Sequence, residues 1–229
     1  MHYEAWSDYY RFAKTSGRPE SFRQTVLETN KRAMESGVAL PPAVQAAVLV
    51  IEDGNARLAD AAALLAESLQ ALEKGGEKES GMAALGWAAD LVAVELERAP
   101  ADMPNRGQAL LHLGAVMTGL GQLETAQIIY ASAMASLEPK QIPSATLQWA
   151  GVLVRLNRHE KAAEVLGNVA AQFPSELNVR LALARVLART GKVAEARTQY
   201  EQLLAVPNLS SPTRDALQRE YDSLPTEPK

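Results

Sequence analysis

The sequence has no cysteine among its 229 residues, which excludes disulfide bonds and thiolate metal sites. It also has no run of about 18 apolar residues, so we expect no membrane insertion. The first residues, MHYEAWSDYYRFAK, contain no basic segment leading into an apolar stretch and therefore do not predict a signal peptide. We expect a cytoplasmic protein, or a periplasmic one if a signal peptide has been removed.

Basic residues are not in excess either. The chain has 23 lysines and arginines against 27 acidic residues, a formal net charge of −4, whereas a nucleic-acid-binding protein needs a basic patch or stripe. The acids are concentrated in residues 37–106, which carry a net charge of −6, while residues 175–229 hold 8 bases and 7 acids. We interpret this polarity as a solvated face and expect no nucleic-acid partner.

Aromatic residues make up only 5% of the chain, whereas alanine alone accounts for 40 residues. Alanine has the highest helix propensity, and its small side chain lets helices pack closely. The composition therefore predicts an all-α fold.

A repeated pattern fills the second half of the chain. The segments GQLETA, NRHEKA and GKVAEA end at Ala126, Ala162 and Ala196, which are 36 and 34 residues apart. A helical stretch precedes each segment and another follows it, and a proline closes each unit. A two-helix hairpin cannot bury both of its apolar stripes alone, so it stacks on copies of itself. The alanines are expected where the helices of a hairpin cross closely.

This pattern resembles the tetratricopeptide repeat. The residues that carry the resemblance are the Leu113–Gly114 pair, Gly121, Ala126, Tyr130 and the closing prolines. Later copies have Trp149–Ala150 and Leu183–Ala184 in place of Leu–Gly. The resemblance implies a solenoid of helical hairpins with right-handed curvature, whose concave surface receives a peptide or protein segment.

The rest of the chain is organised around these repeats. The stretch EKGGEKESG at 73–81 breaks the period, and a Ser–Pro pair starts a final helix at Ser211. We predict divergent N-terminal helical hairpins at 1–73, a hinge, lone helix (81–98) and linker at 74–106, three repeats at 107–210, and a capping helix and tail at 211–229.

The sequence contains no set of residues with a catalytic spacing. HEKAA at 159–163 lacks the second histidine of a zinc-protease helix, and RTGKVAEA at 189–196 lacks the first glycine of a phosphate loop. The glycines of GAVMTGLG at 114–121 lie within a helix and are interpreted as close helix packing. We therefore predict a non-enzymatic protein with no cofactor and no metal.

The implied concave surface gives a candidate peptide site, because first helices of the hairpins line it in the resembled family. Its arginines could form two-pronged hydrogen bonds with carboxylates, and its leucines could bury an apolar side chain. The predicted ligand is an extended segment with acidic and apolar residues. The predicted site residues are Leu111, His112, Leu147, Gln148, Arg155, Leu181, Arg185 and Arg189.

Aromatic residues concentrate in the first 22 positions and suggest a second surface. One side of this helix must pack on its neighbour, and the surplus could meet a partner or a second copy of the chain; the alternative is a bulky end cap. The residues of this surface for a partner or homo-oligomer are Trp6, Tyr9, Tyr10 and Phe12.

These observations together predict a protein–protein interaction adaptor or scaffold. The alternative is a subunit or assembly factor of a larger bacterial secretion, pilus or cell-envelope complex.

Overall fold

A computed structural model describes residues 3–75, 78–207 and 209–225, and within these ranges the secondary structure is helical with no strand. The predicted all-α fold of stacked helical hairpins is confirmed. Contacts divide the chain into two compact units, residues 1–137 and 138–229, and the division falls inside the segment predicted as three repeats.

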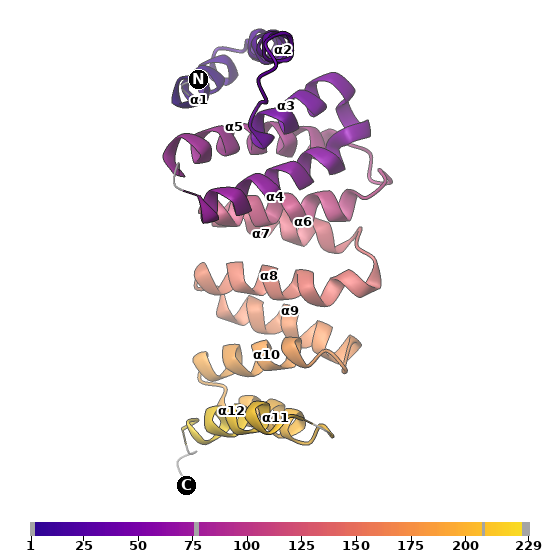
Figure 1. Ribbon diagram of the computed structural model, residues 1–229. Helices are drawn as coiled ribbons and strands as arrows, with labels where there is room; N and C mark the ends of the chain where they lie inside the picture. The colour runs from indigo at the N-terminus through magenta and orange to yellow at the C-terminus, as the bar shows by residue number, and fades with distance from the viewer. Residues whose placement is uncertain (1–2, 76–77, 208, 226–229) are drawn as a thin grey trace. The chain divides into compact units, whose positions relative to one another are not determined.

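The first unit contains seven α-helices in its described part (Figure 1). They are α1 (Tyr3–Thr15), α2 (Pro19–Glu35), α3 (Pro42–Asp53), α4 (Leu58–Lys74), α5 (Lys78–Arg98), α6 (Arg106–Gly119) and α7 (Leu123–Met134). The second unit contains five: α8 (Ile142–Arg155), α9 (His159–Gln172), α10 (Leu177–Arg189), α11 (Val193–Leu204) and α12 (Ser211–Asp222).

The turns of the three clear hairpins follow from single residues. Gly121 and Gly191 both have φ of +76°, and Asn157 has φ of +58°. Glycine adopts this left-handed conformation without strain, and asparagine tolerates it better than other residues with a side chain. The prediction that these positions permit the turns is confirmed.

Small residues set the close packing within the hairpins. Ala126, Ala162 and Ala196 are all 0% exposed, as their aligned positions predicted. At Gly114, an added Cβ would lie 2.9 Å from the ring of Tyr130, so α6 and α7 can approach only because no side chain stands there. The interpretation of these glycines as packing residues is confirmed at this position.

Helix α5 is central to the first unit, where it packs against α1, α3, α4 and α6. The prediction of a loop at 74–80 followed by a helix from 81 differs from the structure. Helix α4 ends at Lys74, and α5 already begins at Lys78, because Lys and Glu are good helix formers even in a stretch rich in charge. Residues 76–77 lie outside the described residues, as does the predicted tail at 226–229.

The second unit has a hydrophobic core of its own. Its buried members run from Ala150 on α8 to Leu217 on α12 and Leu224 just beyond it. Helix α12 begins with Ser210, whose hydroxyl accepts a hydrogen bond from the backbone N–H of Thr213. The last helix therefore closes the core of this unit.

Candidate functional site

The candidate site lies on α8 and α10, which contact one another in the second unit. Residues four apart share one face of a helix, so Leu147, Gly151 and Arg155 form a row on α8. Each has a counterpart 34 residues later, which gives a parallel row of Leu181, Arg185 and Arg189 on α10. We call these six residues the α8–α10 face.

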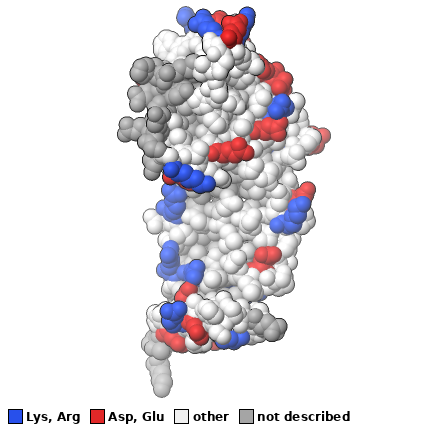
Figure 2. Space-filling view, in the orientation of Figure 1, with Lys and Arg blue, Asp and Glu red and all other residues white. Residues whose placement is uncertain are grey.

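The apolar part of this face is only partly covered. Leu147 and Leu181 are half-buried and pack against the core of the unit, while Gly151 is exposed. An added Cβ at Gly151 would meet no atom within 4 Å, so the face is open there. Figure 2 shows a largely uncharged surface along the middle of this part of the molecule, with basic side chains at one edge. The face can therefore accommodate an apolar group beside a cation.

The three arginines of the face have different surroundings. Arg189 is exposed, and among the residues the structure describes it forms no salt bridge. Arg155 is also exposed and has an interaction partner within the protein, as does the neighbouring Gln148. Arg185 is engaged by the last helix of the chain.

Arg185 holds Glu220 of α12 through two hydrogen bonds. Its Nε donates to Oε2 over 2.8 Å, and its Nη2 donates to Oε1 over 2.6 Å. The hydroxyl of Tyr200 on α11 donates a third hydrogen bond to Oε2 over 2.8 Å. The two-pronged carboxylate contact predicted for a ligand is therefore already formed inside the protein.

The acid–base properties of this cluster follow from the contacts. The hydrogen bonds from Arg185, more than any other cause, lower the pKa of the Glu220 carboxyl. Burial and then the hydrogen bond to Glu220 raise the pKa of Tyr200 to about 12. Hydrogen bonding to Glu220 raises the pKa of Arg185. At neutral pH the cluster therefore holds one carboxylate and one guanidinium, with a neutral phenol beside them.

The two predicted site residues on α6 belong to the first unit. Leu111 is only 7% exposed and takes part in core packing. The Nε2 atom of His112 lies 2.8 Å from the side-chain nitrogen of Gln108, and burial lowers the pKa of the imidazole. Leu111 is thus shielded from a ligand, and the histidine is neutral at pH 7.

The N-terminal aromatic residues mostly pack on each other. Tyr10 is 9% exposed, and its ring centroid lies 5.1 Å from that of Phe22 and 6.4 Å from that of Trp87 on α5. Trp6 lies 5.7 Å from Trp87, and Tyr9 lies 5.6 Å from Phe22, again between centroids. Phe12 is different, because 60% of it is exposed. Burial thus removes Tyr10 from an accessible surface and leaves Phe12 on one.

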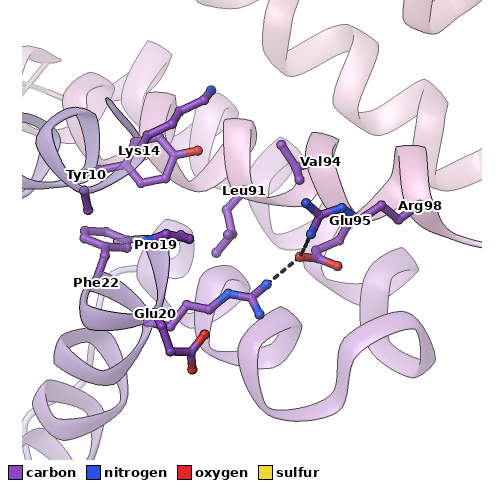
Figure 3. Close-up of a pocket in the computed structure, with 11 residues that line it drawn as sticks. Tyr10, Lys14, Pro19, Glu20, Phe22, Leu91, Val94, Glu95 and Arg98 are labelled. Atoms are coloured by element: carbon purple, nitrogen blue, oxygen red, sulfur yellow. Dashed lines mark hydrogen bonds and ion pairs between the residues drawn. The ribbon is translucent and has the colours of Figure 1, made fainter. Parts of the chain in front are cut away.

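A pocket of about 410 Å³ lies between α1, α2 and α5 of the first unit. Figure 3 shows Phe22 and Pro19 at one end of this pocket and Glu95 with Arg98 at the other. Glu95 accepts hydrogen bonds from Arg23 and from Arg98, the latter over 3.4 Å. Lys14 lies 3.9 Å from Asp90. The charged groups of this pocket therefore pair with each other and hold α2 against α5.

The described residues show no arrangement suited to metal binding or membrane crossing. No three His, Asp or Glu side chains in them come together as a metal site. None of their helices combines the length and apolar character that crossing a bilayer requires.

The sequence did not predict Glu220 and Tyr200 as parts of the site. Tyr200 was assigned only to the repeat pattern, and Glu220 lies in the helix assigned to capping. The separation of 35 residues between Arg185 and Glu220, close to one repeat, is the signal that could have paired them.

The fold and the face define a protein of stacked helical hairpins that offers a binding surface. A family model, Tetratricopeptide repeat, matches residues 153–218, from α8 to α12. The chain is a tetratricopeptide repeat protein, as the spacing of its alanines indicated. Repeats of this family generally mediate protein–protein interaction and are generally non-catalytic. A comparison with curated proteins finds no match.

Proposed function

We propose that the protein is a non-enzymatic adaptor that binds an extended segment of a partner protein on the α8–α10 face. The observation that carries this proposal is the exposed Arg189 beside the half-buried pair Leu147 and Leu181. A guanidinium recognises a carboxylate through a fork of hydrogen bonds, and the leucines bury an apolar side chain. The partner segment therefore carries acidic and apolar residues.

Charge supports an acidic partner for this unit. Residues 138–229 carry a net charge of +2, whereas residues 1–137 carry −6. An acidic segment is therefore attracted to the second unit and repelled by the first, which raises the rate of productive encounter.

A short fluorescent peptide of alternating leucine and glutamate tests the proposal by fluorescence anisotropy. We expect the full-length protein to bind it more tightly than a peptide with glutamine in place of glutamate. Arg189→Gln should weaken binding of the glutamate peptide about fivefold or more, because a hydrogen bond to a charged group is lost.

Arg180→Gln is the matched control, since Arg180 lies on the same helix but donates to Gln199 and Gln202 of α11. It should leave the peptide affinity unchanged. Equal binding of the two peptides, or equal losses in the two variants, would contradict a carboxylate contact at Arg189.

The alternative function, a subunit or assembly factor of a larger complex, is favoured by apolar side chains exposed on the first unit. Phe12 is 60% exposed, Met34 is 76% exposed and Val38 is 58% exposed. Met34 and Val38 border a hollow of about 460 Å³ that also includes Leu40. Light scattering on the parent and on Met34→Ser/Val38→Ser measures whether this surface supports association of the chain with itself.

A further inference from the structure

We infer that Arg185 and Tyr200 form a carboxylate-binding site, which Glu220 occupies in the free protein and an acidic side chain of the partner occupies in the complex. This inference rests on the proposed function of the α8–α10 face and names the contact through which the partner is recognised.

The site is built to hold a carboxylate. Both oxygens of Glu220 are bound, Oε1 by Nη2 of Arg185 and Oε2 by Nε of Arg185 and the Tyr200 hydroxyl. Tyr200 is 2% exposed, so packing fixes its position before any carboxylate binds. Three converging donors on two helices recognise the two oxygens of a carboxylate, and a neutral amide cannot satisfy all of them.

The site is also placed to serve the α8–α10 face. Arg185 stands one helical turn from Leu181 and one turn from Arg189, and its side chain is 54% exposed. Its counterpart on α8 is Gly151, beside which the space is open. A segment lying across the face can therefore reach the guanidinium from the solvent side.

Glu220 is held in a way that permits exchange. Its side chain is 34% exposed, and an exposed ion pair contributes little free energy because water screens it. Helix α12 does not depend on this contact alone, since Leu217 and Leu224 are buried in the core of the unit. Glu220 can thus release Arg185 while the helix stays in place.

Competition between Glu220 and the partner predicts a gain of affinity when the internal carboxylate is removed. Glu220→Gln should bind the leucine–glutamate peptide about two- to fivefold more tightly than the parent, as expected for loss of an exposed ion pair. Affinity for the glutamine peptide should stay unchanged. Circular dichroism confirms that the variant is folded.

Glu201→Gln is the matched control. Glu201 of α11 accepts a hydrogen bond from the Tyr221 hydroxyl over 3.0 Å, so this variant loosens α12 without freeing Arg185. Its peptide affinity should equal that of the parent. If Glu220→Gln does not bind more tightly, or if both variants gain equally, the carboxylate site is overturned.

Hydrogen exchange of the unmutated protein gives an independent measurement. Adding the glutamate peptide should speed amide exchange near Glu220, because its side chain loses its partners, and the glutamine peptide should not. Peptide binding that requires Arg189 but leaves exchange in α12 unchanged would overturn the inference and leave the proposed function intact. Absence of binding in both the parent and Glu220→Gln would instead overturn the proposed function.

Discussion

Two glycines inside helices, Gly114 and Gly151, have opposite surroundings. A Cβ on Gly114 would meet the ring of Tyr130 at 2.9 Å, whereas a Cβ on Gly151 would meet nothing within 4 Å. Glycine inside a helix costs about 0.5–1 kcal/mol relative to alanine. We therefore expect Gly151→Ala to stabilise the protein by about this amount and Gly114→Ala to destabilise it, as measured by urea denaturation.

Gly167, inside α9, is the control for Gly151, since its Cβ would also meet no atom within 4 Å. Gly167→Ala should stabilise the protein by a similar amount. A loss of stability in Gly151→Ala would contradict the open surroundings of this residue.

The buried alanines give the sharpest test of the repeat register. Ala162 is 0% exposed where α9 packs in the core, so Ala162→Leu should destabilise the protein by about 1–3 kcal/mol through overpacking. Ala171, on the same helix, is exposed, and Ala171→Leu should leave the melting temperature nearly unchanged. Equal melting temperatures for Ala162→Leu and the parent would contradict the close contact. The sequence predicted this position because a fixed period and a small side chain are local properties of the chain.

At the scale of elements, α12 does more than cap the second unit. The sequence indicated its start, because Ser–Pro begins helices and Ser210 caps this one. It could not indicate that Glu220 would reach Arg185, since that depends on how α12 docks on α11. For the same reason Arg185 was predicted to be open to a ligand, whereas the structure places a carboxylate on it.

The Arg185–Glu220 contact makes the stability of the second unit depend on pH. The pKa of Glu220 is lowered from its ordinary value of 4.5, so the folded state binds its proton less readily than the unfolded state. Its contribution is therefore complete above pH 4.5 and is lost as the pH falls through the lowered value. In urea denaturation, the parent should be more stable than Glu220→Gln at pH 7, and the difference should shrink below pH 4.5. A constant difference across this range would contradict the coupling.

At the scale of the whole molecule, the two units differ in charge and have separate cores. The net charges of −6 and +2 are properties of sequence composition, but the boundary between the units was not predicted. The 34-residue period runs through Leu137 without interruption, so periodicity alone gives no sign of a division there. Only the distribution of contacts in three dimensions places α6 and α7 with the first unit.

The core of the second unit predicts that residues 138–229 fold alone. All of its buried members lie between Ala150 and Leu224, so no apolar group from residues 1–137 is needed to complete this cluster. We expect the isolated segment 138–229 to give a helical circular dichroism spectrum and a cooperative melting transition, and to bind the glutamate peptide. Residues 107–229, which add α6 and α7, are the comparison. If the longer segment melts cooperatively and the shorter one does not, the three predicted repeats fold as one body and the boundary at Leu137 is not a folding boundary.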